Sequence, residues 1–121
     1  MEHKIWYDEE KKVIYLQVKG DLNSDETLVL GKTCIQLLEG KPYRQMIVDL
    51  QGFKNMESRE TRSVSNRMLN QAGITDVAYV GASSAARMIA KVLMKLGSLK
   101  AASDFFKGFD EANKWIEKRR Q

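Results

Sequence analysis

The fold is decided by residues 44–72, which read RQMIVDLQGFKNMESRETRSVSNRMLNQA. The run over 44–50 is short and apolar with a β-branched centre, which is typical of an interior strand of a parallel sheet. After it, Val64, Met68 and Ala72 recur every fourth residue, which predicts a helix over 58–72. A buried strand followed by an amphipathic helix is part of a βαβ unit, so this stretch indicates an α/β protein.

The rest of the chain alternates between the same two periodicities. Residues 3–7 and 12–19 alternate apolar and polar side chains around the polar turn 8–11, which predicts an antiparallel hairpin. Apolar stripes with capping residues and glycine stops predict further helices. The other predicted elements are helices over 24–40, 83–96 and 110–120 and strands over 77–80 and 102–106.

The predicted architecture is one α/β domain over residues 1–121. Its sheet is mixed and mostly parallel, has four to five strands with the antiparallel hairpin at the N-terminus, and is covered by four helices. A chain of 121 residues is long enough to bury one core and too short for a second domain.

The apolar positions predict which helix faces are buried. The first helix, capped by Asn23 or Ser24, contains Gly31, which indicates close approach of a neighbouring backbone. The last helix is predicted to begin with Asp110 as its cap. The side chains expected to face inward are Leu28, Leu30, Ile35, Leu37 and Leu38 in the first helix, Met88, Ile89, Val92, Leu93 and Leu96 in the third, and Ala112, Trp115 and Ile116 in the last.

Composition excludes several classes of protein. The chain has 20 Lys and Arg against 16 Asp and Glu, which are interspersed. Because no basic cluster with interleaved aromatic residues occurs, no nucleic-acid partner is expected. The chain has no apolar run long enough to span a membrane and no leader-like N-terminus, so a cytoplasmic protein is expected.

Residue types also argue against an enzyme or a metalloprotein. His3 is the only histidine, is expected in a frayed terminus, and cannot complete a zinc set with the single Cys34. Cys34 lies among apolar residues and is expected to be a buried, inert thiol. Asp49, Glu57 and Glu60 have no spacing that makes them an acid–base pair. We therefore expect no catalytic residues, no metal and no cofactor.

A strand-to-helix turn at residues 80–84 is one candidate binding feature. Gly81, Ser83 and Ser84 open the third predicted helix, and Arg87 follows one turn later. Backbone amides at such a helix start can hold an anion or a partner's acidic group, although an ordinary capped helix explains the same residues. The helix also carries Arg87, Lys91 and Lys95 at steps of four, a stripe suited either to solvent or to an acidic partner or anionic lipid.

The second candidate feature is the start of the helix that begins at residue 58. An N-cap serine satisfies free amides with its hydroxyl oxygen, so Ser58 can be a plain helix cap. The same position favours negative charge, so Ser58 can also accept a phosphoryl group, with Glu57 and Arg59 beside it in a partner-binding surface.

The hairpin, the alternating helices and the strand ending in Val48-Asp49-Leu50 resemble the STAS domain of anti-sigma factor antagonists. The spacing from Asp49 to Met56-Glu57-Ser58 is similar to the stretch in which those proteins carry an Asp-Ser phosphoacceptor motif, and the ending DFFKGFDEANKWIEK resembles that of short SpoIIAA-like members. The resemblance implies a non-enzymatic regulatory domain, a protein partner such as a serine kinase of the anti-sigma type, and Ser58 as phosphoacceptor. Arg59-Glu60-Thr61 departs from the small residue, glycine and aliphatic residue that follow the serine in the antagonists.

Two further hypotheses remain open. The exposed edge strand over residues 3–7 is suited to pairing between two subunits, so a homodimer is one prediction. A carrier of a small apolar or lipid-like ligand is the alternative function, since flexible methionine side chains can line a cleft. The methionines considered for that cleft are Met56, Met68, Met88 and Met94.

Overall fold

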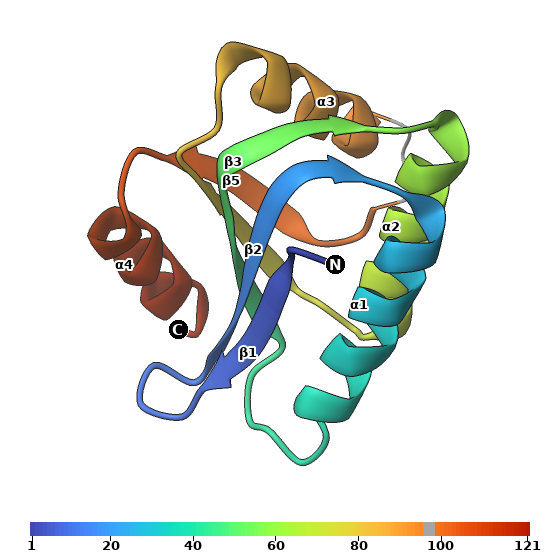
Figure 1. The fold of residues 1–121 in the computed structure, drawn as a ribbon. Helices are drawn as coiled ribbons and strands as arrows, with labels where there is room; N and C mark the ends of the chain where they lie inside the picture. Colours follow the sequence, from blue (N-terminus) through green and yellow to red (C-terminus); the bar gives the residue numbers. More distant parts are fainter. Residues whose placement is uncertain (96–98) are drawn as a thin grey trace.

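The computed structural model describes residues 1–95 and 99–121, which form a five-stranded sheet and four helices (Figure 1). Within that part of the chain the strand order is β1-β2-β3-β4-β5; only β1 and β2 are antiparallel, and every other pair is parallel. The predicted mixed α/β fold is therefore confirmed. In chain order the elements are β1 (Lys4–Asp8), β2 (Val13–Leu22), α1 (Ser24–Leu37), β3 (Gln45–Met56), α2 (Arg59–Gln71), β4 (Asp76–Val80), α3 (Ser84–Lys95), β5 (Ala102–Phe106) and α4 (Phe109–Arg119).

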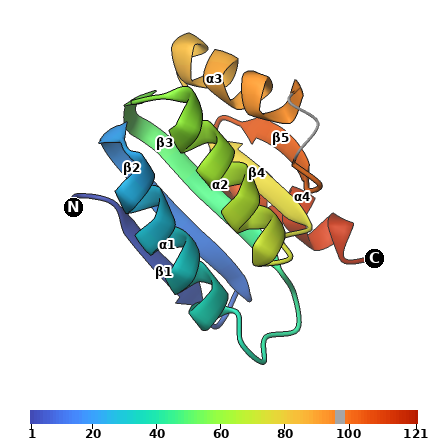
Figure 2. The ribbon, with the colours of Figure 1, turned by 90° about the vertical axis from the view of Figure 1, so that its right-hand side faces the viewer.

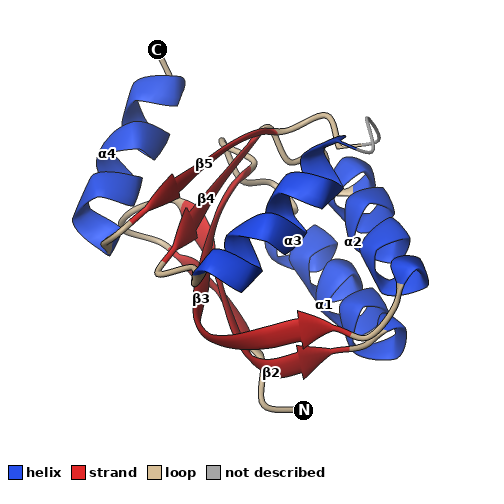
Figure 3. Cartoon of the chain, turned by 90° about the horizontal axis from the view of Figure 1, so that it is seen from above, coloured by secondary structure: helices blue, strands red, loops and turns tan. Residues whose placement is uncertain are grey.

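The helices lie on both faces of the sheet. Helices α1, α2 and α3 cover one face, and α4 lies against the other (Figures 2 and 3). The larger core lies on the three-helix side, whereas Ala112 and Ile116 of α4 pack on Val13, Ile47 and Val80 on the opposite side. Successive strand residues point to opposite faces, which is why β2 and β3 contribute to both cores.

Strands β2 and β3 run further than the sequence predicts. We expected them to end at Lys19 and Leu50, but they continue to Leu22 and Met56. Their extensions pair with each other in parallel, and the register shifts twice along the way. Backbone hydrogen bonds to the neighbouring strand keep the polar stretch 51–55 extended, although its side-chain pattern resembles that of a loop.

Helix α1 buries Leu30 and Leu38 against the core as predicted, and Ile35 is the exception. The sequence left Asn23 and Ser24 as alternative caps; the N-cap is Asn23, which forms a capping box with Glu26. The buried side chains are Thr27, Leu30, Cys34 and Leu38, and Ile35 is exposed. Position 35 lies about 100° around the helix from Cys34, which points it away from the sheet. Gly31 is a site of close approach, but the neighbour is a side chain rather than the predicted backbone: a Cβ there would lie 2.6 Å from the side chain of Met68 in α2.

Helices α3 and α4 also differ in detail from the prediction. In α3 the small residues Ala86 and Ala90 face the sheet, and Met88 and Val92 are exposed. Small side chains let this helix pack close to the strands, which rotates the longer ones outward. Leu96 lies outside the described residues, as does the side chain of Leu93. The N-cap of α4 is Gly108 rather than Asp110, which lies in the first turn of the helix.

His3 is buried, contrary to the frayed terminus expected. Only 7% of its surface is exposed. Its Nδ1 accepts a hydrogen bond of 3.1 Å from the backbone N–H of Lys19, and its Nε2 lies 3.4 Å from the Glu26 carboxylate. The imidazole therefore ties the N-terminus to β2 and α1, a contact between segments far apart in sequence.

A polar cluster fixes the C-terminal helix to the sheet. The buried carboxylate of Asp76 accepts hydrogen bonds from Arg119 Nε at 2.7 Å, Thr75 Oγ1 at 2.8 Å and Gln45 Nε2 at 3.0 Å. Burial by itself favours the neutral acid, but the hydrogen bonds and the charge of Arg119 outweigh it and lower the pKa of Asp76.

This cluster predicts acid-sensitive stability. Because the folded state lowers the pKa of Asp76, its contribution is present above the ordinary carboxyl pKa and is lost as pH falls through the folded value. Urea denaturation at neutral and acidic pH should show that Asp76→Asn lowers the free energy of unfolding at neutral pH by about 2 kcal/mol. The difference in free energy of unfolding between wild type and Asp76→Asn should become smaller at acidic pH. Asp104→Asn, at an exposed carboxylate, is the control and should match wild type at both pH values.

Candidate functional site

Ser58 is the exposed N-cap of α2. Its backbone is extended, and its Oγ accepts a hydrogen bond of 3.1 Å from the backbone N–H of Thr61. The predicted cap is thus confirmed. Since the helix N-terminus carries partial positive charge, the Ser58 hydroxyl lies where an anionic group is favoured. Whether it accepts a phosphoryl group stays a prediction.

A chain of hydroxyl groups joins the start of α2 to the start of α1. Thr61 Oγ1 lies 3.2 Å from Ser58 Oγ and 2.9 Å from Ser24 Oγ, and Thr61 is 1% exposed. The two helices lie side by side (Figure 2). Two helix N-termini therefore lie close together at Ser58, which strengthens the preference for negative charge.

Sequence reasoning missed Thr61 and Ser24 as parts of this site. Thr61 is three residues after the cap, a spacing that could have drawn attention to it. The contact with Ser24 spans 37 residues and has no local signal.

Glu57 and Arg59 flank Ser58 and are exposed. The backbone N–H of Glu57 donates a hydrogen bond of 3.0 Å to Leu22 O, which fastens this loop to the end of β2. Glu60 follows in the first turn of α2, and Arg62 lies one turn after the cap. The tip of α2 thus carries two acidic and two basic side chains around one hydroxyl.

A groove adjoins this tip between the end of β3, the first turns of α2, and α3. It measures about 400 Å³ and has an apolar floor with positive charge contributed by Lys54 and Arg62. Met88 is 69% exposed, so this apolar surface faces outward. The residues that line the groove include no Asp or Glu: Lys54, Asn55, Arg62, Ala85, Met88, Ile89 and Val92.

The turn at the start of α3 is occupied by internal contacts. The backbone N–H of Gly81 donates to Phe106 O at 3.1 Å, and Ser83 Oγ caps α3 by accepting from Ala86 N–H at 3.1 Å. Ser84 is the first residue of the helix, and the Arg87 guanidinium lies over the Phe105 ring at 5.1 Å. These residues gather at one helix start, as predicted, in the arrangement of an ordinary capped helix. Anion binding there stays a prediction.

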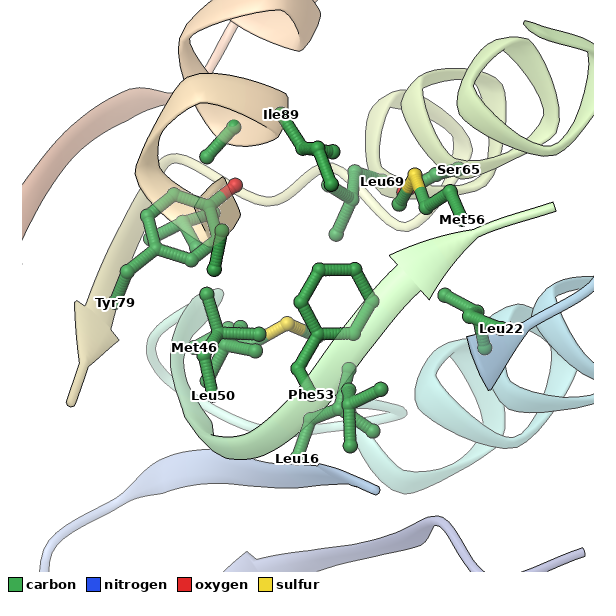
Figure 4. A pocket seen from close by; sticks show the side chains of 15 residues that line it. Leu16, Leu22, Met46, Leu50, Phe53, Met56, Ser65, Leu69, Tyr79 and Ile89 are labelled. Carbon is green, nitrogen blue, oxygen red and sulfur yellow. The ribbon is translucent and has the colours of Figure 1, made fainter. Parts of the chain in front are cut away.

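An apolar pocket lies between the sheet and helices α2 and α3 (Figure 4). It measures about 80 Å³, roughly half of an engineered cavity of about 150 Å³ that takes up benzene. Burial raises the pKa of Tyr79, one of its lining residues, to about 12, so its hydroxyl is neutral. The labelled lining residues are Leu16, Leu22, Met46, Leu50, Phe53, Met56, Ser65, Leu69, Tyr79 and Ile89.

Of the four methionines considered for a cleft, the three whose side chains are described, Met56, Met68 and Met88, do not meet in this pocket. Met56 lines it, Met68 packs beside Gly31 between α1 and α2, and Met88 lies in the outer groove. The side chain of Met94 lies outside the described residues. Nothing in this arrangement favours the carrier hypothesis over a partner-binding surface.

The described part of the chain contains neither an exposed cysteine nor a cluster of metal-binding side chains. Burial raises the pKa of Cys34 to about 11, so this thiol is protonated and shielded, as expected. In residues 1–95 and 99–121, His, Cys, Asp and Glu side chains form no group of three that could hold a metal ion. Among the same residues, no helix has both the length and the apolar character needed to cross a bilayer.

Comparison with solved structures identifies the architecture. Over 98% of this chain and 97% of the other, it matches the unphosphorylated form of the anti-sigma factor antagonist SpoIIAA, with a TM-score of 0.62 and 10% identity. The chain has a SpoIIAA-like fold. An uncharacterised DUF3478-family protein from Shewanella loihica, itself described as SpoIIAA-like, matches over 94% of this chain and 93% of its own with a TM-score of 0.71 and 13% identity. Neither a family model nor a curated protein matches the sequence.

The cap geometry predicts a specific pattern of stabilities at Ser58. Ser58→Ala removes the acceptor for Thr61 N–H and should lower the free energy of unfolding by about 1 kcal/mol, measured by urea denaturation. Ser58→Asp supplies another good N-cap oxygen and should retain wild-type stability. Ser63→Ala, an exposed position in the same helix, is the control. Equal stability of Ser58→Ala and wild type would contradict the capping role.

Proposed function

We propose that this chain is a non-enzymatic regulatory domain that binds a protein partner through the tip of α2 and the adjoining groove. The observation that carries the proposal is the exposed Ser58 hydroxyl at the capped start of α2, next to the start of α1. The SpoIIAA-like fold supports it, since one solved protein with that fold is an anti-sigma factor antagonist described in its unphosphorylated form. The groove supplies apolar contact area beside the hydroxyl.

Phosphorylation of Ser58 is the proposed switch. The partner kinase would be a serine kinase of the anti-sigma type, which transfers the γ-phosphoryl group of ATP to Ser58 Oγ as the hydroxyl loses its proton and ADP leaves. The product carries about −1.5 to −2 additional charge. Glu57 and Glu60 would repel the phosphoryl group, whereas Arg59 and Arg62 would attract it. The two arginine side chains would then point toward the phosphoryl group and no longer toward a partner. The two states would therefore present different charge at the edge of the groove.

Intact-mass measurement tests the switch. Wild type, Ser58→Ala and Ser63→Ala are incubated with ATP and an anti-sigma-type serine kinase from the same organism. Wild type and Ser63→Ala should gain the mass of one phosphoryl group, and Ser58→Ala should gain none. Phosphorylation of Ser58→Ala to the wild-type extent would overturn Ser58 as the phosphoacceptor.

Partner binding gives a separate prediction. Ser58→Asp keeps the helix cap but adds negative charge beside the groove, so it should weaken binding of the partner roughly tenfold, about 1.4 kcal/mol, by calorimetric titration. Ser63→Asp adds the same charge in the second turn of α2 and should bind like wild type. Equal weakening by both variants would mean that net charge rather than the tip of α2 governs binding.

A further inference from the structure

Strand β1 ends the sheet and pairs on one side only. Lys4 to Asp8 are hydrogen-bonded to β2, and within the described residues no strand lies against the other edge of β1. Such an edge presents unpaired backbone N–H and C=O groups, which can pair with a strand of another chain.

The sequence of β1, Lys-Ile-Trp-Tyr-Asp, is complementary to itself in the antiparallel direction. If two copies paired about a two-fold axis at Trp6, Lys4 of one copy would lie opposite Asp8 of the other, and Ile5 opposite Tyr7. Alternate residues share a face, so the opposite charges would meet on the same side of the sheet as Trp6. Asp8 Oδ1 accepts hydrogen bonds from the backbone N–H groups of Glu10 and Lys11 in the turn. The other carboxylate oxygen would be available to Lys4 of the second copy.

The residues at this edge also expose apolar surface. Trp6 is 44% exposed although it stacks on Tyr15 at 5.5 Å. On the other face a groove runs between β1 and α1, where Ile5, Tyr7 and Leu37 lie together with the charged residues Glu9, Glu39 and Lys41. Apolar side chains thus flank the free edge on both faces.

The opposite edge of the sheet lacks this complementarity. β5 reads Ala-Ser-Asp-Phe-Phe, and a two-fold axis at its centre would place two Asp104 carboxylates opposite each other. Directly opposed like charges destabilise a strand pair. Self-pairing is therefore favoured at β1 and disfavoured at β5.

We propose that two copies of this chain form a homodimer by antiparallel pairing of β1 with β1 about Trp6, which joins the two five-stranded sheets into one. Apolar contacts across the axis and the two Lys4–Asp8 pairs provide its specificity. The dimer proposal does not depend on phosphorylation of Ser58, because β1 contributes no residue to the groove beside α2.

Sedimentation equilibrium tests the dimer. Wild type should sediment with twice the chain mass of 13.8 kDa. Lys4→Glu places like charges opposite each other at both ends of the strand pair and should shift the protein to the monomer. Adding Asp8→Asn, which keeps the turn acceptor but removes the opposing charge, should restore part of the association. Lys107→Glu makes the same charge change at an exposed position near β5 and should remain dimeric.

Disulfide trapping tests the register. Residues directly opposite in an antiparallel pair have Cα atoms about 4.5–5.5 Å apart, within disulfide range. Trp6→Cys should therefore cross-link to itself on mild oxidation, whereas Lys4→Cys, about 14 Å from its counterpart, should not. Cys34 is buried and does not interfere. A wild-type monomer at the highest soluble concentration, or equal cross-linking of both variants, would overturn the proposal.

Discussion

The parallel pairing of β2 with β3 is the constraint on which the rest of the structure depends. The pairing continues beyond the point where β4 ends and brings Leu22 level with Met56. Each strand leads within two residues into a helix, α1 after Asn23 and α2 after Ser58. Because the strands are parallel and their last residues lie level with each other, both helices begin at the same end of the sheet.

The candidate site is a direct consequence of that register. Two helix N-termini come together, and Thr61 bonds to hydroxyl groups from both starts. A slip of one residue between the strands would turn their side chains to the opposite face and separate these groups. The cap of α2 is therefore both a structural element and a position where the partial positive charge of the helix N-terminus favours an anion.

The two proposed interaction surfaces occupy different parts of the fold. The groove beside Ser58 is built from β3, α2 and α3, and the dimer edge is β1, at the end of the sheet. Helix α1 connects them, since it contacts β1 along one side and α2 along the other. Self-association through β1 would therefore leave the groove open to a protein partner, and each surface can be altered without the other.

The sequence by itself determined the order of the elements, the hairpin, the cap at Ser58 and the bounds of β5, because periodicity and capping are local properties; for α1 it left Asn23 and Ser24 as alternative caps. Only the tertiary structure decided where β2 and β3 end, that Ile35 and Met88 face outward, that His3 is buried, and that Thr61 bonds to Ser24. Those features depend on which segment lies alongside: a polar stretch becomes a strand when a neighbour satisfies its backbone, and an apolar residue is exposed when a smaller one packs closer. Such partners are distant in sequence, so no local pattern encodes them.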